Sequence, residues 1–144
     1  MPAIYDHRHV VRPDEIDEHG HANNVRYVAW MQSAAIAHSS AQGWTPERYR
    51  GLGCGWVARS HSIEYLAPAF AGDELVIRTW VADFRKTTSL RRYRMIRASD
   101  GAVLARAETN WAFVDIARAA PRRILPEVGE AFEIVASEPE EHPG

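Results

Sequence analysis

Apolar residues along the chain follow two different periods, one typical of a helix and one typical of strands. Residues 24–42 form the longest segment with helical spacing, which begins behind Asn23, a good N-cap residue, and ends before Gly43. Apolar side chains occupy nearly every face of this segment, and such a helix is expected to be buried nearly all round. The pattern therefore predicts one long, buried helix.

Strand-like alternation predicts the rest of the fold. A weakly alternating segment, 5–11, precedes the helix, and residues 13–23 and 45–55 have the polar and turn-forming composition of connections. Four longer strands follow the helix. They are expected at 56–66, 73–84, 88–98 and 102–115, the last two joined by Asp100-Gly101, a strong hairpin signal.

The order of these elements favours an α+β fold. Consecutive strands joined by short turns pair antiparallel. One helix cannot cover both faces of such a sheet, so an antiparallel sheet of about five strands wrapped around one long central helix is a compact solution. The open sheet edge and the leftover apolar surface predict self-association, as a homodimer or a homotetramer.

Composition limits the kind of protein this can be. The 144 residues suit one domain, expected over residues 1–135, with a disordered acidic tail at 136–144. The single Cys54 excludes an intramolecular disulfide and a cysteine-built zinc site. A net charge of −2 argues against general nucleic-acid binding. The chain has neither an apolar run long enough for a membrane helix nor a signal-like N-terminus, so we expect a cytoplasmic protein.

Basic residues are concentrated in one short run. Six of them fall between Arg85 and Arg97 with no acidic residue among them. A solvated strand face and a local site for an anionic ligand both fit this run. The histidines outside residues 13–23 carry no metal-ligand spacing, so no metal site is expected.

The segment 14–27 is the densest polar stretch and lies directly before the predicted helix. It contains the pattern D-x-x-x-H-x-N-N-x-x-Y. This pattern is similar to that of hotdog-fold acyl thioesterases, specifically the 4-hydroxybenzoyl-CoA thioesterase-like branch, and of plant acyl-ACP thioesterases. A second similar signature is I-E-Y-L-A-P-A at 63–69 followed by G-D-E-L at 72–75, and the resemblance spans about residues 5–126. The residues that match the first pattern are Asp17, His21, Asn23, Asn24 and Tyr27.

The resemblance implies roles for these residues. Asp17 is the carboxylate that either attacks the thioester carbonyl or activates water, and the backbone N–H of Asn24 polarises the thioester oxygen. His21 either holds the loop or contributes to catalysis. His19 stands where the plant enzymes have a catalytic asparagine, which weakens the transfer of their mechanism.

Several residues near this motif have structural interpretations. Asn23 is expected to cap the helix, and Tyr27 is expected to line the core or the pocket. Both residues are also candidates for contact with the substrate. Glu64, on the predicted strand 56–66, is a candidate for a supporting position near the helix end.

The resemblance also implies an activity, the hydrolysis of an acyl-CoA, aliphatic or aromatic, to CoA and a carboxylic acid. The basic run then fits the nucleotide phosphates of CoA, and the channel lies at a dimer interface. No metal or organic cofactor is required. An acyl-ACP thioesterase and a non-catalytic acyl-CoA-binding module remain the alternatives. The residues expected to contact CoA are Arg85, Lys86, Thr87, Thr88, Ser89, Arg91 and Arg92.

Overall fold

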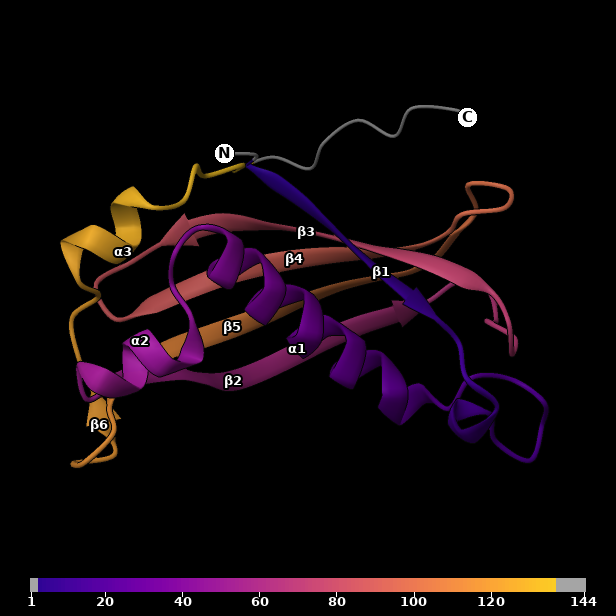
Figure 1. Ribbon diagram of the computed structural model, residues 1–144, viewed down its shortest axis with the longest axis horizontal. Helices are drawn as coiled ribbons and strands as arrows, with labels where there is room; N and C mark the ends of the chain where they lie inside the picture. The colour runs from indigo at the N-terminus through magenta and orange to yellow at the C-terminus, as the bar shows by residue number, and fades with distance from the viewer. Residues whose placement is uncertain (1–2, 137–144) are drawn as a thin grey trace.

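The computed structural model describes residues 3–136, which form a curved antiparallel sheet with one long helix, α1, lying across one face (Figure 1). The strand order is β1-β3-β4-β5-β2, with β6 paired to the far end of β5. Strands β3, β4 and β5 follow each other along the chain, whereas β1 and β2 are added at the two edges. The strands are β1 Ile4–Val10, β2 Cys54–Tyr65, β3 Glu74–Phe84, β4 Thr88–Arg97, β5 Val103–Asp115 and β6 Ala120–Pro121.

This arrangement confirms the predicted hotdog fold and its long helix, α1, at Asn24–Ala41. The turn-rich stretch 45–55 proves to contain a short helix, α2, at Pro46–Gly51. Thr45 caps it, accepting a hydrogen bond from the Arg48 N–H at 3.1 Å. Sequence analysis also missed helix α3 at Pro126–Glu130, strand β6 and the 3₁₀ turn Pro13–Glu15.

The prediction that α1 is buried nearly all round is wrong for the single chain. One face of the helix packs on the sheet through Tyr27, Trp30 and Met31. The opposite face is open, with Val25 74% and Ile36 50% exposed. The reason is geometric, because the sheet curves around only one side of the helix and nothing in residues 3–136 covers the other.

Buried side chains form two clusters at the two ends of α1. The first lies between α1 and the sheet and contains Trp30, Leu75 and Met95. The second joins α2 and α3 to the sheet through Trp44 and Phe113. The loop that enters α1 therefore lies at one end of the molecule, and α2, α3 and β6 lie at the other (Figure 1).

Two expectations concern the ends of the chain and membrane association. The predicted tail at 136–144 lies, apart from its first residue, outside the described residues. Among residues 3–136, no helix has the length and apolar character needed to span a membrane.

Candidate active site

The loop 11–23 joins β1 to α1 and carries the polar motif. Its start is fixed to the residue just before β3, since the Val11 N–H donates to the carbonyl of Asp73 at 2.9 Å. Its end is fixed to its own beginning, since the Asn23 N–H donates to the carbonyl of Glu15 at 2.8 Å. The loop is therefore an ordered element that sets where α1 begins.

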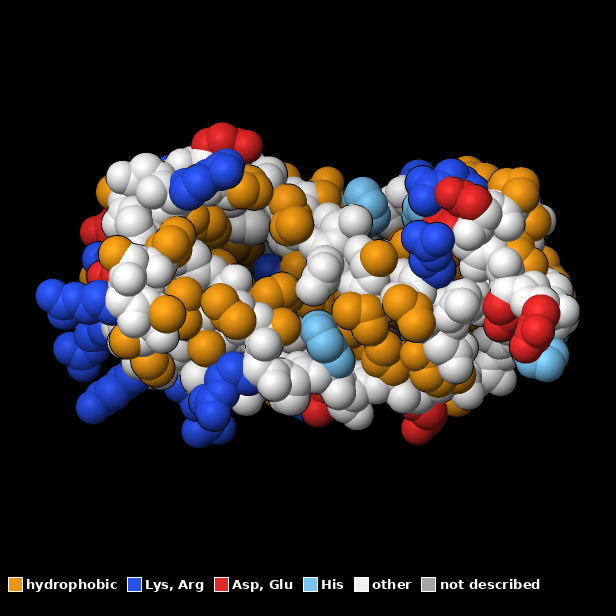
Figure 2. All heavy atoms as spheres, turned by 90° about the horizontal axis from the view of Figure 1, so that it is seen from below, with side chains coloured by type: hydrophobic (Ala, Val, Ile, Leu, Met, Phe, Trp, Pro, Cys, Tyr) orange, Lys and Arg blue, Asp and Glu red, His pale blue; other side chains and the backbone are white. Residues whose placement is uncertain are grey.

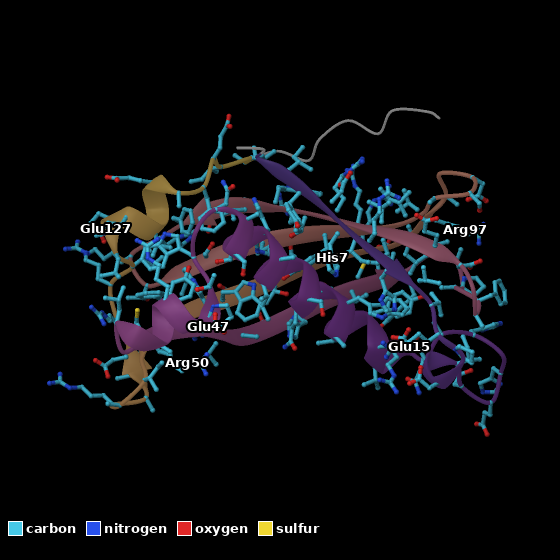
Figure 3. All side chains as sticks on the ribbon, viewed as in Figure 1. His7, Glu15, Glu47, Arg50, Arg97 and Glu127 are labelled. Carbon is cyan, nitrogen blue, oxygen red and sulfur yellow. The ribbon has the colours of Figure 1, made fainter. Side chains whose placement is uncertain are left out.

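Glu15 is a buried carboxylate in this loop, only 3% exposed, and sequence analysis missed it. Its Oε1 accepts from the Arg12 N–H at 2.9 Å and lies 2.7 Å from His9 Nε2. Its Oε2 accepts from Trp30 Nε1 at 2.8 Å. Burial raises the pKa of Glu15, but these hydrogen bonds outweigh that effect, so the pKa is lowered overall. Figure 3 shows Glu15 at the N-terminal end of α1, where it ties β1, the loop and the helix together.

Asp17 is half-buried in the tight turn that follows. Its N–H donates to the His21 carbonyl at 2.8 Å, and its Oδ1 accepts from the His19 N–H at 2.9 Å. The other carboxylate oxygen, Oδ2, accepts no hydrogen bond from residues 3–136. One oxygen of Asp17 thus holds the turn, and the second is left for another partner.

The start of α1 presents one free backbone donor among the described residues. Asn23 is the N-cap as predicted, because its Oδ1 accepts from the Val25 N–H at 3.0 Å. The Asn24 N–H makes no hydrogen bond within residues 3–136, as expected for the first residue of a helix. It lies at the positive end of the helix dipole, where a developing negative charge is stabilised.

A cavity of about 270 Å³ lies at this helix end. Asn24, His21 and Tyr27 line it, together with Tyr65 at the end of β2. The Tyr65 hydroxyl donates to the Asn24 carbonyl at 3.3 Å. Tyr65, rather than its neighbour Glu64, is thus the β2 residue that reaches the helix end, and the signature I-E-Y-L-A-P-A already contained it.

The histidine and tyrosine of the motif take different positions around this cavity. The His21 side chain packs edge-on against Phe70 and makes no hydrogen bond within residues 3–136, so only its backbone holds the loop. Tyr27 is 2% exposed and therefore serves both as core and as cavity wall. Asp17 itself does not line the cavity, but it is joined to His21 by the backbone hydrogen bond.

The structure separates the members of the basic run. Arg85 and Lys86 are exposed in the β3–β4 turn, and Arg85 lies 3.5 Å from Asp83. Arg92 lies 3.5 Å from Glu108, and Arg97 is paired with Asp100 at 2.7 Å. Arg91 is buried between β4 and α1, away from the exposed turn.

The predicted site residues therefore fall into two groups at opposite ends of one chain. Asp17, His21 and Asn24 lie near the start of β3, which is anchored to the loop at residue 73. The turn 85–89 lies beyond the other end of β3, an 11-residue strand that is roughly 35 Å long. One chain does not bring these two groups together.

The sequence analysis expected no metal site. Among residues 3–136, no group of three or more His, Cys, Asp or Glu side chains is placed to hold a metal ion.

Comparison with solved structures gives many similar chains. A provisionally assigned oleoyl thioesterase from Lactobacillus plantarum superposes with a TM-score of 0.85 at 23% identity, covering 95% of this chain and 54% of its own. This chain thus spans about half the length of that protein. A 1,4-dihydroxy-2-naphthoyl-CoA thioesterase from Synechocystis superposes with a TM-score of 0.82 at 17% identity. The match covers 89% of this chain and 94% of that one. A DHNA-CoA thioesterase from Staphylococcus aureus superposes with a TM-score of 0.84 at 18% identity. The match covers 89% of this chain and 87% of that one. At these identities the likeness shows the fold alone.

Sequence comparison identifies the family. No curated protein sequence matches the chain significantly. The family model of the thioesterase-like superfamily matches residues 11–132, from the loop before α1 to the end of α3 and beyond. The match includes the whole polar motif and all four long strands after the helix. The chain therefore belongs to the thioesterase-like superfamily.

Proposed function

We propose that this protein hydrolyses acyl-CoA thioesters to CoA and a carboxylic acid. The observation that carries the proposal is the Asn24 N–H at the start of α1, which makes no hydrogen bond within residues 3–136. Asn24 lines the cavity beside the Asp17 turn. A donor held there by the helix can stabilise the oxyanion that forms when a thioester carbonyl is attacked. The superfamily assignment supports the same class of reaction.

The proposed reaction uses few groups. A water oxygen attacks the thioester carbonyl carbon, the carbon–sulfur bond breaks, and the proton taken from water by Asp17 passes to the leaving thiolate. In the second possible route Asp17 attacks directly, forming a mixed anhydride that water then hydrolyses. The carboxylate oxygen that is free of the turn, Oδ2, is the one available for either role. A single turnover in H₂¹⁸O that leaves label on Asp17 shows direct attack, since water must then have opened the anhydride at the Asp17 carbonyl carbon.

The basic end of the molecule supports CoA as the carrier. Basic side chains gather at the end that carries α2 and β6, seen on the left of Figure 2. Phosphate groups are bound well by such clusters of Arg and Lys. The exposed basic residues of these elements and the adjoining turns are Arg48, Arg50, Arg85, Lys86, Arg118 and Arg123.

Lys86→Ala is expected to raise KM for an acyl-CoA about 5-fold or more with little change in kcat. The nucleotide lies far from the reacting carbonyl, so its contacts are the same in ground and transition states. The effect should shrink at high salt and vanish for acyl-pantetheine, which lacks the phosphates. Arg97→Ala is the matched control, because Arg97 belongs to the same run but is already paired with Asp100. If Lys86→Ala raises KM equally for acyl-CoA and for acyl-pantetheine, Lys86 does not bind the nucleotide.

We further propose that the protein works as a homodimer. The exposed apolar face of α1 and the exposed edge strand β2 need covering, and a second copy would bring the β3–β4 turn of one chain near the Asp17 loop of the other. Sedimentation at micromolar concentration is expected to give a particle of twice the chain mass. A stable folded monomer contradicts this arrangement.

The deciding experiment for the function is a hydrolysis panel with free thiol detected. It uses short, medium, long and aromatic acyl-CoAs and one acyl-ACP, with the Asp17→Asn variant as the matched control. Hydrolysis of an acyl-CoA that the variant lacks supports the proposal. Hydrolysis of acyl-ACP but of no acyl-CoA makes the protein an acyl-ACP thioesterase and rejects CoA as the carrier of the substrate. Tight acyl-CoA binding without hydrolysis makes the protein a binding module and rejects the proposed activity.

A further inference from the structure

A second, larger cavity of about 400 Å³ lies at the opposite end of α1 from the Asp17 loop. It is bordered by the C-terminal half of α1, by α2 and by the sheet. Its lining is largely apolar and includes the aromatic side chains of Trp44, Trp56, Phe84 and Phe132. Figure 2 shows a hollow on this face with hydrophobic side chains around it and a basic side chain deep inside. The volume and the apolar lining are those of a pocket for a small organic molecule.

Two arginines line this cavity, and they differ in their surroundings. Arg50, labelled in Figure 3, is exposed on α2 at the rim. Arg91 comes from β4 and is only 6% exposed. Its Nη1 lies 2.9 Å from His38 Nδ1 and donates to Thr79 Oγ1 at 3.1 Å. The guanidinium carbon stands 5.9 Å from the ring centre of Phe132.

The partners of Arg91 leave its charge unbalanced. Thr79 is neutral, and His38 must accept with an unprotonated Nδ1 because a guanidinium has only donors. Within residues 3–136 no carboxylate lies within 4 Å of the guanidinium, and its Nε and Nη2 groups make no hydrogen bond. Burial lowers the pKa of Arg91, although an arginine stays protonated in proteins.

A buried charge without a counter-ion is costly, whereas a carboxylate fits the planar fork of a guanidinium through two parallel hydrogen bonds. Such a pair is strong where water is excluded. Of the described residues that line the cavity, only Arg91 carries a buried positive charge, which matches a ligand with one negative charge and an apolar body. We propose that this cavity binds an amphipathic organic acid, with its carboxylate on Arg91 and its apolar part against the aromatic side chains.

The proposed acid site is distinct from the Asp17 site within one chain. His38, which contacts Arg91, lies one long stretch of helix after Asn24, about 21 Å along the axis of α1. Binding of an acid in this cavity therefore does not rest on the proposed hydrolysis. An equilibrium binding measurement tests it without any turnover.

The test compares dodecanoate with dodecanamide, which has the same shape but no charge, by calorimetry on the purified full chain. Wild-type protein is expected to bind dodecanoate about tenfold to a hundredfold more tightly than the amide. In Arg91→Met this ratio should fall to about 1, with the affinity for the amide nearly unchanged. One control variant should keep the wild-type ratio. Arg94→Met removes the other buried arginine of β4, which does not line the cavity.

The wild-type protein alone can overturn the proposal. Equal affinity for acid and amide, or no binding of either, rejects it even if Arg91→Met fails to fold. An unchanged ratio in a folded Arg91→Met also rejects it. The source of the acid is then found by comparing dodecanoyl-CoA with the same acyl-CoA carrying an ω-carboxylate. If the ω-carboxylate lowers KM and this decrease depends on Arg91, the acid is the far end of a substrate. If the ω-carboxylate does not lower KM, the ligand is a free acid.

Discussion

Asp17→Asn is expected to reduce kcat by on the order of 10²-fold or more while the fold and acyl-CoA binding persist. The amide keeps the size of the side chain but loses the basic, nucleophilic oxygen. It also keeps an oxygen that can accept the hydrogen bond from the His19 N–H, so the turn is retained. The measurement is kcat with the best substrate of the panel, together with the melting temperature and the affinity for that substrate.

Asp14→Asn is the matched control for this variant. Asp14 is an exposed carboxylate of the same loop and accepts from Arg12 Nε at 3.1 Å. Its loss should leave kcat within about twofold. If Asp17→Asn keeps the wild-type kcat, or if Asp17→Asn and Asp14→Asn lose kcat equally, Asp17 does not take part in the reaction.

Glu15→Gln is expected to lower the free energy of unfolding by about 2–3 kcal/mol at pH 7. Both oxygens of Glu15 receive donors, so the amide NH₂ must face either the Trp30 indole N–H or the Arg12 N–H. A donor facing a donor in a buried site leaves both unsatisfied. Urea unfolding measures the change. Glu18→Gln, a fully exposed carboxylate of the same loop, should alter stability by less than about 0.5 kcal/mol.

The pH dependence of this difference has a definite sign. The pKa of Glu15 is lower in the folded protein than its ordinary value of 4.5. The ionised carboxylate therefore contributes stability fully above about pH 4.5, and the contribution is lost as the pH falls through the folded value. The gap between wild type and Glu15→Gln should narrow below pH 4.5. A gap that is constant from pH 7 to pH 3 would contradict the role of the charge.

Local signals predicted much of the fold. Asn23 caps α1 as its residue type suggested, and the hairpin at Asp100-Gly101 joins β4 to β5. The segment 45–55 carries the same kind of signal for α2, since Thr45 is a capping residue and Pro46 is a favoured first residue of a helix. Such signals are readable because each depends on residues close together in the chain.

The exposed face of α1 could not be predicted, for a physical reason. Val25 and Ile36 are as apolar as the residues that pack on the sheet, so composition around the helix does not tell which face is covered. Only the curvature of the sheet, which follows from the pairing of distant strands, decides it.

The site shows the same division between local and distant information. Asp17 and Asn24 could be singled out as candidates because the motif is contiguous in sequence. Glu15 was missed because its partners His9 and Trp30 come from a strand and a helix on either side of the loop. The burial of Arg91 was hidden because alternation assigns two faces to β4 without telling which one meets α1.

The strand order has a consequence for how the protein acquires its site during folding. Strands β3, β4 and β5 form a meander of neighbours in sequence, whereas β1 must close a loop of more than sixty residues to reach β3. Closing a long loop costs more entropy than forming a hairpin, so the meander should order first and β1 later. The Asp17 loop, anchored to β1 through His9 and Glu15, then becomes structured only at the last stage. Pulsed hydrogen exchange should protect the amides of β4 before those of β1, and the reverse order would contradict this sequence of events.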